Sequence, residues 1–215
     1  TTPITMTGNL RILVTGFGPF PGAPFNPTGP LVEKLARMRR PRWADIKIVP
    51  HVFPTSYAAV DRDLPTLIAK HKPDAILMFG LAPRAKTIRI ELRARNTLAL
   101  LPDACGAARA MKVAPGGPSA IALPAPIAQL LAAARAARVP VVRSHDAGRY
   151  LCNYLCWRAS GAVRRKNGPR LVAFVHVPKV VRLPRRPGKR RATTLADLSR
   201  AGAALLAVVA RVRHV

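Results

Sequence analysis

Short apolar runs alternate along the chain with longer segments whose apolar residues recur at helical spacing. The runs of strand length are Leu10–Thr15, Ile46–Phe53, Asp74–Leu81, Pro140–Ser144 and Leu171–Val177. The segments of helical character are Leu31–Met38, Ser56–His71, Ile127–Arg138, Arg149–Ala159 and Thr194–Val212. Because this alternation is typical of α/β domains, the pattern predicts a largely parallel sheet with helices packed against it.

Two stretches depart from this pattern. Thr87–Asn96 alternates strictly, with apolar residues on one face and Glu91 among arginines on the other, which predicts a single half-buried strand. Residues 102–126 are rich in Gly, Pro and Ala and predict an irregular segment. No internal repeat or convincing linker divides the chain, so we expect one domain over residues 1–215, with residues 1–9 as a loose extension.

The glycines after the first predicted strand do not complete a nucleotide-binding motif. Gly16 and Gly18 begin a G-x-G-x-x-G pattern, but Pro21 stands where the third glycine would fall, and no phosphate-loop Lys-Ser/Thr pair follows. Asn26 and Pro27 instead fit a helix N-cap followed by proline at the first helical position. We therefore expect no nucleotide cofactor at this loop.

Composition excludes some classes of protein. The chain has 215 residues, of which 49% are hydrophobic, enough to bury a core. Its longest apolar stretch, within Ala203–Ala210, is far shorter than the roughly 18–20 residues that cross a bilayer, so no membrane span is expected. No secretory signal is visible in the first ten residues, and three cysteines cannot form a paired disulfide framework. A reducing, cytoplasmic location is therefore expected.

The charge is strongly positive. Lys and Arg number 36 against 9 Asp and Glu, which gives a formal net charge of +27. Basic runs at Arg182–Arg191, Arg37–Arg42 and Arg164–Lys166 are compatible with a nucleic-acid-binding protein. Aromatic residues make up only 5%, so platforms for base stacking are scarce, and a compositional habit accounts for the charge equally well. We expect nonspecific, salt-sensitive nucleic-acid binding and keep a nucleic-acid-binding role as an alternative function.

The strongest chemical signal is a cysteine at a predicted helix start. Cys152 follows the strand that ends near Ser144 and falls in the first turn of the next helix. Unpaired backbone N–H groups and the helix dipole there stabilise a thiolate, and the same N–H groups can hold a developing oxyanion. A small buried residue is the ordinary alternative. Cys152 and Cys156 make a weak zinc candidate, because no second Cys or His pair stands nearby at ligand spacing.

Two further residues are candidates for catalysis. His176 lies near the carboxyl end of the predicted strand 171–177, the end at which α/β sheets assemble their sites, although a hydrogen-bonded core histidine is equally compatible. Glu91 is one of only two glutamates, and its default role is that of one member of an exposed charged face. The residues alone do not show that Cys152, His176 and Glu91 meet.

A series of motifs extends over almost the whole chain. They are Val14–Phe20, Asn26–Thr28, Gly80–Pro83, Ile88–Glu91, Asn96, Pro102–Asp103, Pro115–Ala120, Ala147–Tyr154 and Val175–Pro178. Their residues and their order resemble those of the pyroglutamyl peptidase I (pyrrolidone-carboxylate peptidase) family of cysteine peptidases. The expected fold is a three-layer α/β/α sandwich around a mostly parallel twisted sheet, and the resemblance suggests a homotetramer.

The resemblance also implies a mechanism. Cys152 would attack the carbonyl that follows an N-terminal pyroglutamyl (5-oxoprolyl) residue, His176 would transfer the proton, and Glu91 would orient His176. Water would then hydrolyse the resulting thioester, with no metal and no organic cofactor. The expected partner is accordingly a peptide that begins with pyroglutamate.

The resemblance further implies a pocket for the substrate. Phe17 and Phe20 match the paired pocket aromatics of the family. Together with Asn26 and Leu81, they are expected to bind the substrate. The lactam ring carries no ammonium group, so its pocket should be apolar with a few hydrogen bonds to the amide.

The chain departs from the family pattern around the triad. Arg84 and Ala85 replace a Gly-Arg pair, and Leu92 replaces the arginine that usually follows the catalytic glutamate. His145 and Asp146 stand before the helix of the nucleophile, where they offer either a competing base or a solvated loop pair. A relative with a different acyl-amide substrate, or with little activity, is therefore an alternative function.

Overall fold

The computed structural model describes residues 9–109, 111–181 and 193–211. The expected loose extension, apart from Asn9, and the basic run 182–191 lie outside the described residues. In chain order the elements are β1 (Leu10–Phe17), α1 (Thr28–Arg37), a 3-10 turn (Pro41–Trp43), β2 (Ile46–Phe53), α2 (Tyr57–His71), β3 (Ala75–Leu81), β4 (Ile88–Glu91), β5 (Arg93–Arg95), β6 (Ala120–Ala122), α3 (Ile127–Ala136), β7 (Val141–Ser144), α4 (Leu151–Val163), β8 (Leu171–Val177) and α5 (Leu195–Val209).

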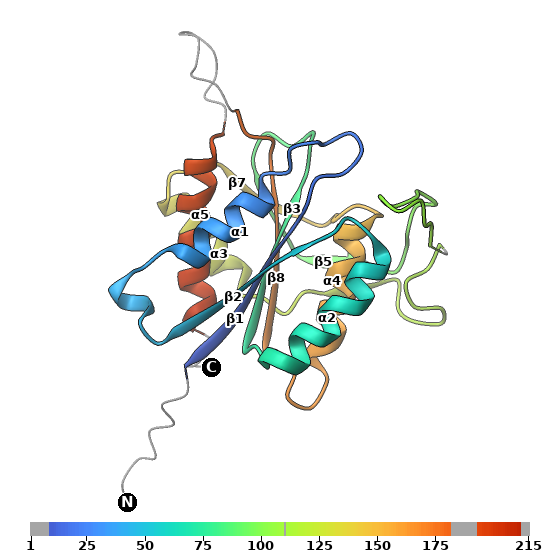
Figure 1. The fold of residues 1–215 in the computed structure, drawn as a ribbon, viewed down its shortest axis with the longest axis horizontal. Coiled ribbons are helices and arrows are strands. Elements are labelled where there is room, and N and C mark those ends of the chain that lie inside the picture. The colour runs from blue at the N-terminus through green and yellow to red at the C-terminus, as the bar shows by residue number, and fades with distance from the viewer. Residues whose placement is uncertain (1–8, 110, 182–192, 212–215) are drawn as a thin grey trace, which may run out of the picture.

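Six strands form the central sheet, in the order β2-β1-β3-β8-β4-β7. β2, β1, β3 and β8 run parallel, whereas β4 pairs antiparallel with β8, and β7 runs parallel to β4. β5 and β6 form a separate antiparallel pair. The carboxyl ends of β1, β3 and β8 lie together at the upper end of Figure 1. The predicted, mostly parallel α/β sheet is confirmed.

Helices cover both faces of this sheet (Figure 1). α1, α3 and α5 pack on one face, in one cluster with Ile12, Leu77 and Val175. α2 and α4 pack on the other face, in a cluster with Met78 and Phe174. Successive strand residues point to opposite sides, so a strand between two helical layers is apolar throughout. Every residue of β3 and β8 is indeed buried, and the three-layer arrangement follows.

The loop after β1 is tied to the start of α1. α1 begins at Thr28 with Pro27 as its N-cap, so the predicted N-cap at Asn26 is wrong by one residue. The Asn26 Oδ1 still accepts the Thr28 N–H at 3.1 Å, and its Nδ2 donates to the Gly18 carbonyl at 3.1 Å. Thr28 packs so closely on Gly16 that a Cβ on Gly16 would lie 2.7 Å from the Thr28 carbonyl oxygen. The glycine is therefore needed for this close approach.

The prediction of one strand over Thr87–Asn96 is wrong. β4 ends at Glu91, and after Leu92 the chain leaves the central sheet to form β5. The Leu92 N–H donates to the Ser144 carbonyl at 2.8 Å, and the Leu92 carbonyl accepts the Leu123 N–H at 2.9 Å, so this residue joins the two sheets. Glu91 is fully buried as a result, and its assignment to an exposed charged face is also wrong.

Other differences from the predicted elements are small. α4 begins at Leu151 rather than Arg149, which makes Cys152 its second residue. The segment 102–126 is not wholly irregular, because it contains β6. Within the described part of the chain, no helix is long and apolar enough to cross a membrane.

Candidate active site

Three side chains from distant parts of the sequence meet on the face of the sheet that α2 and α4 cover. His176 lies on β8, and Glu91 is the last residue of β4, the neighbouring strand. Cys152 is in the first turn of α4, which packs over β8. The structure thus brings together the three residues that the sequence put forward for catalysis.

His176 interacts with both of the other residues. Its Nδ1 lies 2.7 Å from Glu91 Oε1, and both side chains are buried. Burial alone would lower the pKa of His176, but the charge and hydrogen bond of Cys152, together with those of Glu91, raise this pKa to about 9. The imidazole is therefore protonated at neutral pH and lies between the Cys152 sulfur and the Glu91 carboxylate. This is the electrostatic arrangement that a cysteine–histidine pair needs for nucleophilic attack.

The Cys152 sulfur lies against a glycine of the sheet. Gly80 of β3 is paired in register with His176, and a Cβ on Gly80 would lie 2.8 Å from Cys152 Sγ. Glycine therefore provides the space that the thiol occupies. The N-cap of α4, Tyr150, makes no side-chain hydrogen bond to the helix start in the described structure. The first-turn N–H groups beside Cys152 are thus without a side-chain cap and can bind a developing anion.

A cavity of about 60 Å³ opens beside Cys152. Its lining consists of Phe17, Phe20, Asn26, Thr55, Leu81, Tyr150, Leu151 and Cys152. All four residues predicted to bind substrate are among them. The Asn26 amide and the Thr55 hydroxyl both donate to the Gly18 carbonyl, which fixes two polar groups in a mostly apolar wall. The cavity is therefore suited to a small ring that carries an amide.

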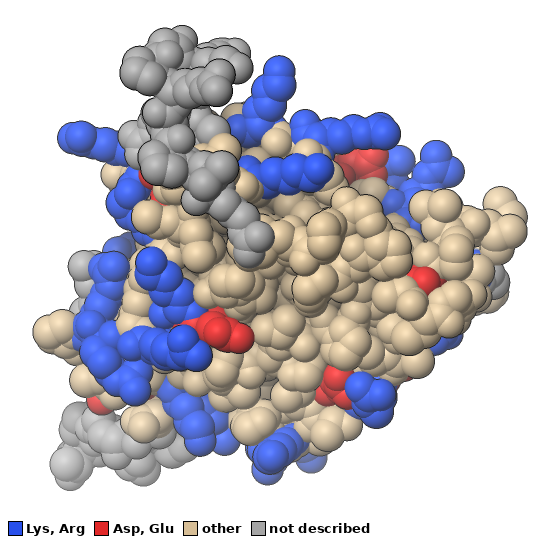
Figure 2. Space-filling model, turned by 45° about the horizontal axis from the view of Figure 1, so that its top comes forward, with Lys and Arg blue, Asp and Glu red and all other residues tan. Residues whose placement is uncertain are grey.

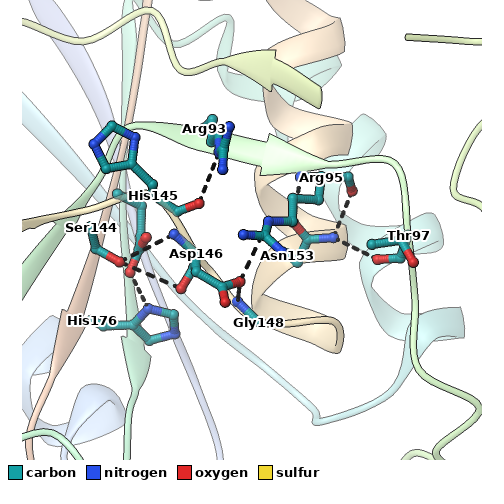
Figure 3. A network of polar contacts seen from close by, with 10 residues as sticks. Arg93, Arg95, Thr97, Ser144, His145, Asp146, Gly148, Asn153 and His176 are labelled. Atoms are coloured by element: carbon teal, nitrogen blue, oxygen red, sulfur yellow. Dashed lines mark hydrogen bonds and ion pairs between the residues drawn. The ribbon is translucent and has the colours of Figure 1, made fainter. Parts of the chain in front are cut away.

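Asn153, the residue after the candidate nucleophile, fixes the start of α4 against β5 (Figure 3). It is fully buried, and its Oδ1 accepts the Arg95 N–H at 2.7 Å. Its Nδ2 donates to the carbonyls of Arg95 at 2.8 Å and Thr97 at 3.1 Å. The amide thus satisfies three backbone groups and sets the position of Cys152 relative to the small sheet.

The network in Figure 3 also contains His145 and Asp146, which form hydrogen bonds with Arg93 and Gly148. The Arg93 Nε donates to the His145 carbonyl at 2.9 Å, and Asp146 Oδ1 accepts the Gly148 N–H at 3.0 Å. In Figure 3 the His145 ring points away from His176. The pair is a solvated loop in this structure and offers no base to the candidate nucleophile.

The other cysteines differ from Cys152 in their surroundings. Cys156 is completely buried, and burial raises its pKa well above the ordinary value. Cys105 is exposed, and none of the three cysteines, all of which are described, forms a disulfide. Among residues 9–109, 111–181 and 193–211, no group of three or more His, Cys, Asp or Glu side chains could hold a metal ion.

Comparison with known proteins identifies the family. A family model described as pyroglutamyl peptidase matches residues 10–190. The chain is 31% identical over 173 residues to a pyrrolidone-carboxylate peptidase of Pyrococcus furiosus, covering 80% of this chain and 82% of that protein. A relative of the same name from Clavibacter michiganensis is 35% identical over 170 residues, covering 78% of each chain. The chain belongs to the pyroglutamyl peptidase family.

Solved structures of pyrrolidone carboxyl peptidases have the same fold. A mutant enzyme from P. furiosus superposes with a TM-score of 0.83 at 26% identity, over 94% of this chain and 99% of that one. The enzyme from Thermococcus litoralis gives a TM-score of 0.82 at 26% identity, over 94% and 93%. This pyroglutamyl peptidase family member is accordingly a cysteine peptidase, and the predicted family and fold class are confirmed.

Three residues of this pyroglutamyl peptidase family member shape the site in ways the sequence reasoning missed. Gly80 makes room for the sulfur, Asn153 fixes α4, and Asp103 caps α2. A signal existed for Gly80, since a glycine inside a buried strand often marks a close approach. Asn153 and Asp103 gave no comparable signal, because their partners are backbone groups 58 and 46 residues away along the chain.

Proposed function

We propose that this protein hydrolyses the amide bond that follows an N-terminal pyroglutamyl residue. The proposal rests on one observation: His176 interacts with both Glu91 and Cys152 beside a small, mostly apolar cavity. A buried imidazolium with a pKa near 9 can protonate a departing amine at neutral pH. The relatives named pyrrolidone-carboxylate peptidase support the same class of substrate.

The first half of the reaction forms a thioester. The Cys152 thiolate attacks the carbonyl carbon of the pyroglutamyl residue, and the carbonyl oxygen becomes an oxyanion. The uncapped N–H groups at the start of α4 are suited to stabilise that oxyanion. When the tetrahedral intermediate collapses, the C–N bond breaks, and His176 Nε2 donates its proton to the leaving amine. Glu91 holds the imidazole by accepting the hydrogen bond from Nδ1.

The second half releases the acid. Neutral His176 takes a proton from a water molecule, whose oxygen attacks the thioester carbon. The C–S bond then breaks, the sulfur leaves as a thiolate, and free pyroglutamate departs. The imidazolium–thiolate pair is restored, so neither a metal nor an organic cofactor takes part.

The cavity favours a neutral lactam over a free amino terminus. Phe17, Phe20 and Leu81 supply apolar surface on which a flat five-membered ring can pack. A charged ammonium group at this position would lose its hydration without gaining a carboxylate, because the cavity lining contains no acidic residue.

An amidase assay with a matched mutant tests the proposal. Wild-type protein is expected to release the chromophore from a neutral pyroglutamyl anilide, and Cys152→Ser is expected to lower kcat at least about 1,000-fold. Cys105→Ser is the control, because it removes an exposed thiol that does not line the cavity. Wild-type protein that is folded and inactive, or a Cys152→Ser variant that retains turnover, would contradict the proposal.

We also propose a cytoplasmic homotetramer. Three unpaired thiols fit a reducing compartment. Leu100 and Met111 are 74% and 72% exposed on neighbouring parts of one loop, and such apolar side chains favour contact between subunits. Sedimentation of the wild type and of a Leu100→Ser/Met111→Ser variant tests the assembly. A monomeric wild-type protein at micromolar concentration would contradict it.

A further inference from the structure

An arginine lies beside the candidate catalytic histidine on the same face of the sheet. Arg89 of β4 is paired directly with His176 of the antiparallel neighbour β8. Directly opposed residues of antiparallel strands point to the same face, with Cβ atoms about 5 Å apart. Glu91, two residues further along β4, also lies on this face and contacts His176 at 2.7 Å. Arg89 therefore rises from the same face as Glu91 and His176.

The charge of Arg89 is not neutralised within the described part of the chain. Arg89 is exposed and makes no ion pair or side-chain hydrogen bond with another described residue, whereas Arg93 and Arg95 have partners in the network of Figure 3. Residues 75–90 and 171–181, which form β3, β8, β4 as far as Ile90 and the adjoining turns, contain no Asp or Glu. Glu91 at the end of β4 is hydrogen-bonded to His176.

The charged residues in the turns before β4 and after β8 are all basic, and the exposed Asp146 in the loop after β7 is paired with Arg95 at 3.8 Å. Arg84 and Lys86 are exposed in the turn between β3 and β4, and Lys179 is exposed just after β8. Figure 2, in which the upper end of Figure 1 is turned forward, shows many Lys and Arg side chains and few Asp and Glu on this side of the molecule. The positive potential at this edge therefore favours an anionic ligand.

Substrate geometry indicates where such an anion would lie. The pyroglutamyl ring belongs in the cavity lined by Phe17, Phe20 and Leu81, on one side of Cys152. The leaving amine is protonated by His176, so the residue that carries this amine must lie over β8. The strand next to β8 on the side away from β3 is β4, which presents Arg89.

On the basis of the proposed function, we propose that Arg89 is a specificity-determining residue that binds a carboxylate on the leaving side of the scissile bond. The preferred substrate is then a peptide in which the residue after pyroglutamate carries a negative charge. That carboxylate is either an acidic side chain or the free carboxyl terminus of a dipeptide. A guanidinium group binds both by the same charge-assisted hydrogen bonds.

Four substrates that differ only beyond the scissile bond test the proposal. They are pyroglutamyl-alanine amide, which is neutral, pyroglutamyl-alanine, with a terminal carboxylate, pyroglutamyl-glutamate amide, with a side-chain carboxylate, and pyroglutamyl-lysine amide, which is cationic. The wild-type kcat/KM is expected to be about five- to tenfold higher for at least one carboxylate substrate than for the neutral one at low salt. The lysine substrate is expected to be the poorest. Comparison of the two carboxylate substrates shows which source is recognised.

Two substitutions separate a local contact from the general charge. Arg89→Gln is expected to reduce the carboxylate preference to about twofold or less. Arg143→Gln is the matched control, because Arg143 is an exposed arginine on β7 that pairs with Ile90 and therefore points to the opposite face. It removes the same charge and is expected to keep the preference. A preference that is absent in the wild type, survives Arg89→Gln or falls equally in both variants would overturn the proposal.

Failure of this inference is distinguishable from failure of the proposed function. Hydrolysis of the neutral amide with no charge preference leaves the proposed function intact and overturns the role of Arg89. If no substrate is hydrolysed, the proposed function fails. In that case, calorimetry of the four compounds with Cys152→Ser protein tests whether Arg89 binds a carboxylate. Selective binding of the carboxylate compounds that depends on Arg89 supports this role. Equal binding of all four compounds, or no binding, overturns it.

Discussion

At the scale of single residues, the site depends on a glycine, Gly80, as much as on its reactive side chains. Gly80 lies in the central sheet opposite His176, and its α-carbon faces both Cys152 Sγ and the ring of Phe174. The Phe174 ring is fully buried and packs edge-on against the His176 imidazole, with ring centres 5.0 Å apart. Neither the ring nor the sulfur can move away without disturbing the contact between Cys152 and His176.

Replacing Gly80 by alanine is therefore expected to damage catalysis more than folding. The new Cβ would lie 2.8 Å from the Cys152 sulfur and 2.7 Å from Phe174 Cζ, so the sulfur must shift. A shift of this size is expected to lower kcat about 100-fold. The control is Gly161→Ala on the exposed side of α4, where a Cβ meets nothing within 4 Å. That change should keep activity and stabilise the fold by about 0.5–1 kcal/mol, as thermal unfolding can show. Equal activity of both variants would contradict this account.

On the proposed mechanism, the raised pKa of His176 should set the alkaline limit of activity. Burial lowers this pKa, but Cys152 and Glu91 raise it to about 9, so the imidazolium that protonates the leaving amine is lost as pH rises through about 9. The kcat/KM of the wild type should fall there. Glu91→Gln keeps the size of the side chain and removes one of the groups that raise the pKa, so its descending limb should lie at lower pH.

The raised pKa of His176 also predicts how the stability of the protein depends on pH. Because the pKa of folded His176 lies above its ordinary value of 6.5, protonation favours the folded state. This contribution is complete below pH 6.5 and is lost as the pH rises through about 9. The free energy of unfolding, measured with denaturant, should therefore fall across this interval by more in the wild type than in Glu91→Gln. If the kcat/KM of the wild type and of Glu91→Gln fell at the same alkaline pH, this result would argue against coupling between Glu91 and His176.

Glu91 also shows where inference from the sequence reaches its limit at this scale. Strict alternation over Thr87–Asn96 places it among exposed arginines, and only its resemblance to a family motif identifies it as a candidate. The alternation misleads because strand pairing changes at Leu92, through hydrogen bonds to Ser144 and Leu123. Those partners are 52 and 31 residues away, and no local periodicity contains them.

At the scale of elements, one loop supports a wall of the cavity through hydrogen bonds to the starts of two helices. Asp103 accepts the N–H of Tyr57, in the first turn of α2, at 2.8 Å. The neighbouring Ala104 N–H donates to the Thr55 carbonyl at 2.9 Å, and the Tyr150 hydroxyl donates to the Pro102 carbonyl at 3.0 Å. Thr55 and Tyr150 both line the cavity, so the loop holds this wall in place.

Removing the Asp103 carboxylate should loosen this wall. Burial raises the pKa of Asp103, but hydrogen bonds from the backbone of Tyr57, Ala107 and Cys105 outweigh this and lower it. Asp103→Ala should therefore cost about 1–3 kcal/mol of stability and raise KM for the pyroglutamyl anilide. In the wild type, the stability that the Asp103 carboxylate contributes is present above its ordinary pKa of 3.8. This stability is lost as the pH falls through the lower pKa that Asp103 has in the folded state. Urea unfolding beside the exposed-site control Asp45→Ala checks this, and equal losses in both variants would contradict it.

The sequence predicts the order of the helices and strands better than it predicts which strands pair with one another. The five long helices and the five apolar strands were located to within a few residues, because their periodicities are local. β6 was missed within 102–126, since a three-residue strand has too little pattern to stand out from Gly and Pro. Its pairing with β5 depends on contacts 25 or more residues apart along the chain.

At the scale of the whole molecule, the net charge of +27 has a physical consequence beyond the site. A surface of this sign attracts the phosphate backbone of nucleic acid without reading its sequence. We expect random-sequence duplex DNA on a column to retain the protein at low salt and to release it as salt rises. Cys152→Ser should elute with the wild type, because it leaves the charged groups in place. A preference for one DNA sequence, or retention at about 1 M salt, would contradict a purely electrostatic attraction.

The position of β8 has a consequence for how the protein is made. It is the last strand in the described chain, yet it lies in the middle of the sheet, between β3 on one side and β4 on the other. A nascent polypeptide that has not yet emerged past residue 177 holds two sheet fragments with nothing to join them. It also lacks His176, so Cys152 is without this neighbour until β8 is inserted. On the proposed mechanism, peptidase activity therefore requires that β8 has been inserted into the sheet.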